Sequence, residues 1–246
     1  MKIVVIGGTG LIGSKVVARL GEHGHQAVPA APNTGVNTLT GEGVKEVLQD
    51  ANVVIDVSNS PSFADNDVME FFRTSTTNLL EAAGAAGVGH YVALSVVGAD
   101  RLPDSGYLRA KVAQEELIKG SGLPYSIVHA TQFFEFAGGI ADSATVDGTV
   151  RLSSASMQPI AAAEVASAVG RTAAGAPING TLEVAGPEVF ALDQWIGTVL
   201  AARSDPRTVV ADPQARYFGS LPKFELLPGR DAQLGQIRLS EWLSGN

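Results

Sequence analysis

A tyrosine and a lysine one helical turn apart, with a serine upstream, are the residues of this sequence best suited to acid–base chemistry. Tyr107 and Lys111 share one face of the helix that the pattern predicts over residues 107–119. A phenol has a pKa of about 10, and a neighbouring ammonium favours the phenolate and lowers that pKa. Ser95 lies at the tip of a predicted strand over residues 90–97. We therefore expect Ser95 to hold a substrate oxygen while Tyr107 protonates a carbonyl oxygen as hydride reaches the carbon.

The first fourteen residues indicate the source of the hydride. The β-branched run over residues 3–6 predicts a strand buried on both faces, and residues 11–20 have a helical pattern. The glycines between them suit a tight turn that lets a pyrophosphate approach the backbone at the helix N-terminus. The sequence thus predicts dinucleotide binding by Gly7, Thr9, Gly10, Leu11, Ile12 and Gly13.

The segment after the second predicted strand bears on which dinucleotide is bound. An Asp or Glu at that position binds the adenine ribose of NAD, and its absence leaves room for the 2′-phosphate of NADP. Residues 30–35 contain no acid and no arginine. NADP is therefore favoured over NAD, with Asn33, Thr34 and backbone amides as the phosphate contacts, although an ordinary turn explains the same residues. Ser58 and Asn59 follow the third strand, either beside the nicotinamide half or as turn formers.

Strands and helices alternate along the chain, which predicts an α/β fold with a doubly wound parallel sheet of the Rossmann type. We expect residues 1–155 to form the dinucleotide-binding domain and residues 156–246 to complete the fold with a small substrate-side lobe. In that second part, residues 158–161 and 181–185 are predicted strands, and residues 163–174 and 192–203 are predicted helices, the last capped near Asp193. The aromatic residues expected in the lobe are Tyr217, Phe218, Phe224 and Trp242.

The composition excludes several classes of function. With 45% hydrophobic and 17% charged residues, the chain resembles a globular protein, and a net charge of −8 disfavours nucleic acid and anionic membranes as partners. The absence of cysteine excludes disulfides and thiolate nucleophiles. His23 and His25 are close in sequence, but they follow a helix C-terminus, so no metal site is predicted. No apolar run is long enough for a membrane span or signal-peptide core, and we expect a cytoplasmic protein.

These motifs, in this order, resemble the short-chain dehydrogenase/reductase superfamily, in its atypical, NmrA-like, NAD(P)H-binding branch. The resemblance covers about residues 1–136 and, more loosely, the remainder. It implies a Rossmann fold, Tyr107 as acid/base, Lys111 on the nicotinamide ribose and on Tyr107, and Ser95 polarising the substrate. Many relatives carry the active hydroxyl one or two residues later, where this chain has Val96 and Val97, so contact of Ser95 with the cofactor is the alternative.

The expected function is NADPH-dependent reduction of a small, largely apolar ketone, aldehyde or quinone. The short loop between Ser95 and Tyr107 argues against a large nucleotide-sugar substrate. Phe133 and Phe134, just past a predicted strand, either wall the substrate pocket or belong to the core. Two alternatives stay open: a non-catalytic NADP(H)-binding redox sensor, and an isomerase or epimerase that retains NAD. A homodimer and a monomer are both compatible with the sequence.

Overall fold

The computed structural model describes residues 1–221 and 226–245 and is built on a seven-stranded parallel sheet, in the order β12-β9-β5-β4-β3-β1-β2. Phe224, one of the aromatic residues expected in the lobe, lies outside the described residues. The strand order reverses at β1: β2 lies on one side of it, and the later strands, starting with β3, lie on the other side, as in a doubly wound fold. This confirms the predicted α/β Rossmann architecture. The strands are β1 (Lys2–Ile6), β2 (Gln26–Ala30), β3 (Val53–Asp56), β4 (His90–Val96), β5 (Tyr125–Ala130), β9 (Gly180–Ala185) and β12 (Gln233–Leu234).

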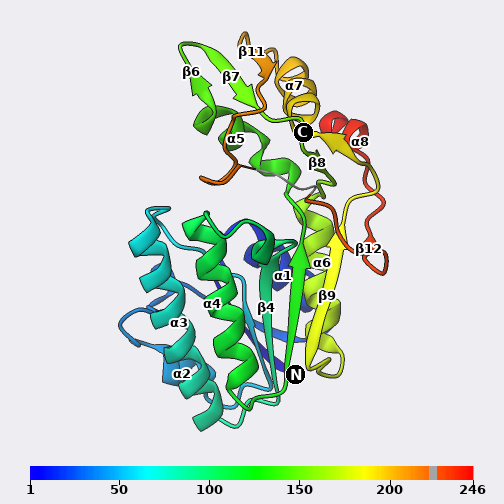
Figure 1. The fold of residues 1–246 in the computed structure, drawn as a ribbon. Helices are drawn as coiled ribbons and strands as arrows, with labels where there is room; N and C mark the ends of the chain where they lie inside the picture. The colour runs from blue at the N-terminus through cyan, green and yellow to red at the C-terminus, as the bar shows by residue number, and fades with distance from the viewer. Residues whose placement is uncertain (222–225, 246) are drawn as a thin grey trace.

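Helices cover both faces of the sheet (Figure 1). Side chains alternate along each strand, so Ile3 and Val5 pack in the core with α1 and α6, while Val4 and Ile6 pack in the core on the opposite face. The first face carries α1 (Leu11–Glu22) and α6 (Ala162–Ala174), and the second carries α2 (Val44–Leu48), α3 (Asp65–Ala85) and α4 (Gly106–Gly120). The β-branched runs that the sequence shows are therefore buried on both sides, as a parallel sheet requires.

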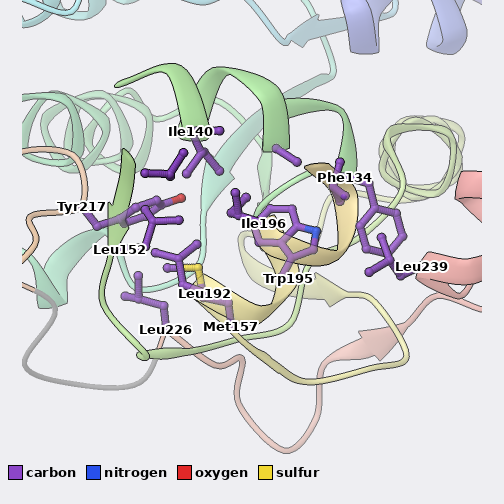
Figure 2. Close-up of a cluster of buried hydrophobic side chains, with 14 of the residues drawn as sticks. Phe134, Ile140, Leu152, Met157, Leu192, Trp195, Ile196, Tyr217, Leu226 and Leu239 are labelled. Carbon is purple, nitrogen blue, oxygen red and sulfur yellow. The ribbon is translucent and has the colours of Figure 1, made fainter. Parts of the chain in front are cut away.

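A smaller lobe lies beyond the carboxyl ends of the central strands (Figure 1). Its core surrounds Trp195, which is fully buried, and contains Phe134, Met157 and Tyr217 (Figure 2). Its helices are α5 (Ala137–Ser143), α7 (Leu192–Ala202) and α8 (Leu239–Ser244). Its strands are β6 (Thr145–Val146), β7 (Thr149–Leu152) and β11 (Thr208–Ala211) in one sheet, and β8 (Ser156–Met157) with β10 (Phe190–Ala191) in another.

The chain crosses between the central sheet and the lobe more than once. Residues 137–157 build α5, β6, β7 and β8 of the lobe, and α6 and β9 then return to the central sheet. Elements on both sides of residue 155 thus contribute to each part of the molecule. The connections place the lobe beside the strand ends where ligands lie in open α/β sheets.

Two local predictions in the second half of the chain are wrong. Residues 158–161 do not form a strand: Pro159 has no N–H to donate, and the segment makes only an isolated bridge between Ile160 and Phe133. The paired strand is β8, immediately before it. Asp193 does not cap α7 either, because the helix begins at Leu192 and its N-cap is Ala191, which has no capping side chain.

Candidate functional site

Three glycines of the turn between β1 and α1 are needed for its own packing. A Cβ at Gly8 would stand 2.6 Å from the Val5 carbonyl oxygen. Gly7 has a φ of +77°, and a Cβ there would stand 2.9 Å from the Ser58 backbone. A Cβ at Gly13 would stand only 2.1 Å from the carbonyl oxygen of Gly7. All three positions therefore require glycine because β1, β2, β3 and α1 approach one another closely.

Gly10 is different, because the protein itself does not fill the space beside it. A Cβ there would meet only the Gly7 carbonyl oxygen, at 3.3 Å, and its φ of −81° suits any residue. Gly10 is the N-cap of α1, no side chain caps the helix, and its first turn contains no acid. An uncapped helix N-terminus with open backbone suits a pyrophosphate, so the residues present fit a bound dinucleotide.

The adenine end of the predicted site brings Thr9 and Asn33 together. The Thr9 hydroxyl donates to the Asn33 side-chain oxygen over 3.2 Å, and Asn33 is exposed. The Thr34 hydroxyl is occupied by its own 3₁₀ turn: it donates to the Ala31 carbonyl and accepts from the Ala31 N–H, each over 2.9 Å. Thr9 and Asn33 therefore offer side chains to a ligand here, while Thr34 shapes the turn that presents Asn33.

Ser58 and Asn59 lie differently although they are adjacent. Ser58 is beside the glycine turn because β3 pairs with β1 in a register that aligns Asp56 with Ile6. The Ser58 hydroxyl donates to the Asp56 carboxylate over 2.6 Å, whereas Asn59 is exposed and accepts from the Ser60 N–H. Both residues follow the carboxyl end of β3, as predicted, and the side chain of Ser58 is held by the buried carboxylate of Asp56.

Lys111 is held inside a polar network on the first turns of α4. Only 3% of its surface is exposed, and its ammonium donates to the Leu94 carbonyl over 2.9 Å and to the side-chain oxygen of Gln114. The ammonium also lies 4.4 Å from the centroid of the Phe72 ring. Burial lowers the pKa of Lys111 to about 8, against the opposing effect of Asp56 and Glu115.

Tyr107 lies on the same face of α4 as Lys111 and is surrounded by aromatic rings. Its ring centroid lies 5.5 Å from that of Phe218, 5.6 Å from that of Phe63 and 6.1 Å from that of Phe72. Burial raises the pKa of Tyr107 to about 12. This is opposite in direction to the lowering expected from Lys111, because removal of the phenol from water disfavours the charged phenolate.

Ser95 and a carboxylate that the sequence analysis did not single out form a second network. The Ser95 hydroxyl is buried and donates to Glu115 over 2.6 Å, and the same carboxylate oxygen lies 2.8 Å from His129 Nε2. Lys119 binds the other oxygen over 3.1 Å. Although burial raises the pKa of Glu115, the hydrogen bonds from His129, Ser95 and Lys119 lower it to about 2. The hydroxyl of Ser95 is thus engaged inside the protein, and its contact with substrate or cofactor stays a prediction.

Asp56 connects the cofactor side of the site with Lys111, and the sequence analysis also missed it. Its carboxylate is buried and accepts from Tyr91 over 3.2 Å, from Gln114 over 2.9 Å and from Ser58. Gln114 bridges the two residues: its side-chain N–H donates to Asp56, and its side-chain oxygen accepts from Lys111. An acid at the end of an otherwise apolar buried strand was the signal in the sequence, because such a group requires partners.

The two phenylalanines predicted to wall the pocket lie in different environments. Phe134 is fully buried and packs against Trp242, with ring centroids 5.5 Å apart, so the structure does not support it as a pocket residue. It begins a 3₁₀ turn (Phe134–Phe136) whose hydrogen bonds turn the ring into the lobe core. Phe133 is partly exposed and stacks on Phe136 at 5.1 Å.

Comparison with known proteins defines the class. Residues 7–172 match a family described as NAD(P)H-binding, and the chain belongs to that family. The match confirms the NAD(P)H-binding family that the sequence motifs indicated and is consistent with the expected NmrA-like branch. The chain therefore binds a pyridine dinucleotide through a Rossmann domain.

The known proteins that this chain resembles differ in function. The chain is 27% identical over 149 residues to the photosystem II assembly factor Ycf39 of Cyanophora paradoxa, a match that covers 55% of this chain and 46% of that protein. A dTDP-glucose 4,6-dehydratase from Streptomyces venezuelae, solved with NAD, has a TM-score of 0.79 at 16% identity, covering 100% of this chain and 95% of its own. An NADPH-dependent quinone oxidoreductase from Escherichia coli, solved with NADPH, has a TM-score of 0.66 at 20% identity, covering 85% and 77%. These structural likenesses concern the fold.

Metal ligands and membrane-spanning helices can be assessed only for the residues that the structure describes. Within residues 1–221 and 226–245, no group of three or more metal-ligating side chains could hold a metal ion. Over the same part of the chain, every helix is too short or too polar to cross a membrane.

Proposed function

We propose that this protein is an NADPH-dependent reductase of a small, largely apolar carbonyl compound. The observation that carries the proposal is the position of Tyr107 and Lys111 on the first turns of α4, beside the carboxyl end of β4 and across the sheet from the glycine turn. Ligands of open α/β sheets lie at this edge. A proton donor and a cation therefore lie where a nicotinamide and a carbonyl would meet.

Each residue of the candidate site has a separate role in the proposed reaction. Bound NADPH supplies the hydride. Tyr107, whose raised pKa keeps it protonated at neutral pH, donates its proton to the carbonyl oxygen as the carbon accepts that hydride. The Lys111 ammonium stabilises the negative charge that Tyr107 acquires, and Asp56 and Gln114 hold the ammonium in place. Phe72, which is fully buried, packs against the phenol ring with centroids 6.1 Å apart.

NADPH is the proposed cofactor form because the end of β2 offers no carboxylate. Asn33 is exposed there and linked to Thr9 of the glycine turn. The N–H groups of a neutral amide can donate to the 2′-phosphate, whereas an acid in the same place would repel it. A matched pair of titrations with NADPH and NADH tests this choice, and tighter binding of NADH would overturn it.

The test of function is the change in NADPH absorbance with a panel of ketones, aldehydes and quinones. The parent protein, Tyr107→Phe and Tyr125→Phe are compared. Tyr125 is the first residue of β5, so it lies at the amino ends of the parallel strands, away from the proposed site, and serves as the matched control. We expect turnover by the parent and by Tyr125→Phe, and a loss of about a hundredfold or more in Tyr107→Phe. Equal turnover by Tyr107→Phe would refute the assignment of the acid.

A second candidate function is a non-catalytic NADP(H)-binding sensor. The observation that favours it is the engagement of two of the three Lys111 N–H donors by Leu94 and Gln114, together with a Tyr107 pKa raised instead of lowered. The similarity to an assembly factor supports the same reading. The sensor predicts tight NADPH binding with no turnover over the whole panel. An NAD-retaining isomerase would instead keep its cofactor through purification and leave nicotinamide absorbance unchanged.

A further inference from the structure

Two exposed phenylalanines from distant parts of the chain meet at Tyr107. Phe63 follows β3 and Phe218 follows β11, and 58% and 43% of their surfaces are exposed. Phe218 stacks on Tyr107 with an interplanar angle of 20°, and the Phe63 and Phe218 ring centroids are 6.5 Å apart. The result is an open apolar surface made of ring faces beside the proposed proton donor.

The backbone of Phe218 is in an unfavourable conformation. Its φ is +48°, in the left-handed region that residues other than glycine and asparagine rarely adopt, and Gly219 follows at +81°. Such a conformation persists only where the surroundings enforce it, and it is concentrated at functional sites. Here Phe218 and Gly219 are the central residues of a tight turn that is closed by hydrogen bonds between the Tyr217 and Ser220 backbones, and such a turn requires a positive φ at both positions. The neighbouring Tyr217 ring, 4.7 Å from that of Phe218, belongs to the lobe core (Figure 2).

A buried polar atom without a partner lies next to these rings. Gln132 follows β5 and is only 9% exposed, and its side chain hydrogen-bonds to the Tyr217 hydroxyl. Its side-chain oxygen accepts no hydrogen bond from any of the described residues. A buried acceptor left unpaired is costly, so this oxygen is suited to receive a hydrogen from a ligand.

We propose that Phe63, Phe218 and Gln132 form the binding site of a planar aromatic carbonyl substrate that carries a hydroxyl group. The rings of Phe63 and Phe218 contact the faces of the aromatic ring, and the Gln132 side-chain oxygen accepts the hydrogen of the hydroxyl. The contacts continue from Gln132 through Tyr217 and Phe218 to Tyr107, the proposed proton donor. This proposal rests on the proposed function and names its substrate class.

Binding to the complex with NADP⁺, in which no hydride can be transferred, separates this proposal from the reductase activity. Calorimetry compares 4-hydroxyacetophenone, acetophenone and cyclohexyl methyl ketone on the parent protein. We expect 4-hydroxyacetophenone to bind about tenfold more tightly than acetophenone, through the hydrogen bond to Gln132, and acetophenone to bind severalfold more tightly than the saturated ketone. Equal binding of the three ketones, or no binding of any, overturns the proposal. Turnover with NADPH is then measured separately and tests only the reductase.

Variants locate the site. Phe218→Leu removes the ring but keeps an apolar side chain, and Phe136→Leu is the matched control because Phe136 is a 48% exposed phenylalanine stacked elsewhere. We expect Phe218→Leu to erase the preference for acetophenone over the saturated ketone and Phe136→Leu to leave it unchanged; the reverse result overturns the assignment.

Gln132 is tested by a variant that is similar in shape but lacks the acceptor. We expect Gln132→Met to erase the preference for 4-hydroxyacetophenone over acetophenone while the Kd for NADP⁺ stays at the parent value. If Gln132→Met fails to fold, Gln132→Glu keeps an acceptor and is expected to keep the preference. A loss of NADP⁺ affinity in Gln132→Met, with the preference retained, would assign the oxygen to the cofactor and overturn the proposal.

Discussion

Replacement of Gly10 by alanine separates a glycine kept for a ligand from one kept for packing. A Cβ at Gly10 would meet only the Gly7 carbonyl oxygen, at 3.3 Å, whereas a Cβ at Gly13 would meet the same oxygen at 2.1 Å. Reduced freedom of the unfolded chain stabilises a Gly→Ala variant by about 0.4–1 kcal/mol, and alanine at an N-cap loses a similar amount. The stability of Gly10→Ala is therefore expected within about 1 kcal/mol of the parent.

Gly13→Ala is expected to behave in the opposite way. The overlap with the Gly7 carbonyl forces the turn or α1 to move, which costs about 1–3 kcal/mol or more. For a chain of this length that corresponds to a fall in Tm of roughly 2–12 °C. Gly13→Ala thus loses stability, while Gly10→Ala loses cofactor affinity by about tenfold or more because the methyl group occupies the approach of the pyrophosphate.

Thermal unfolding without ligand and titration with NADPH measure the two effects separately. Gly21→Ala is the matched control, since Gly21 is in the same helix and a Cβ there would meet nothing within 4 Å. It should bind NADPH as the parent does and be slightly more stable. If Gly10→Ala bound NADPH with the parent Kd, the pyrophosphate would not pass this position and our placement of the cofactor would be refuted.

Three further predictions concern charge. The proposed reductase rate is expected to fall above pH about 8 as the Lys111 ammonium is lost. Because Asp56 raises the pKa of Lys111, Asp56→Asn should move this fall in rate to lower pH. A pH–rate profile in which the fall stays at the same pH would contradict this role of Lys111. The pKa of Glu115 is lowered in the folded state, to about 2, so its stabilisation is complete above the unfolded value of about 4.5 and is lost as pH falls through 2. Denaturation over this range should show Glu115→Gln less stable than the parent at pH 6, by up to about 3 kcal/mol, with the gap closing toward pH 2. Asn33→Asp should weaken NADPH about tenfold or more relative to NADH in paired titrations, and unchanged relative affinities would remove Asn33 from the phosphate site.

Local sequence patterns predicted most elements of the central sheet because each pattern reports one physical requirement. The β-branched run of β1 requires burial on both faces, and the glycines after it permit the turn, so strand, turn and helix follow from neighbours in the sequence. The same reasoning failed at residues 158–161, where pairing depended on a distant partner, and at Asp193, where β10 decided where α7 begins.

Parts of the candidate site could be found from spacing and parts could not. Tyr107 and Lys111 share a helix face, so four positions of separation were enough to bring them together. The hydrogen-bond partners of Lys111 were not predictable in this way, because Gln114 links it to Asp56 across the packing of α4 on the sheet. The direction of the Tyr107 pKa also depended on burial by Phe63 and Phe218, which approach from other segments.

The sequence by itself determined that this chain has a Rossmann fold and binds a pyridine dinucleotide, since the strand, glycine turn and helix are contiguous and their requirements are local. Tertiary structure alone decided which polar groups are available and which are engaged. Ser95 is bound by Glu115, Phe134 is packed in the lobe core, and the buried side-chain oxygen of Gln132 has no partner among the residues that the structure describes. Whether a side chain is free for a ligand depends on contacts between segments far apart in the chain, and only the folded protein brings those segments together.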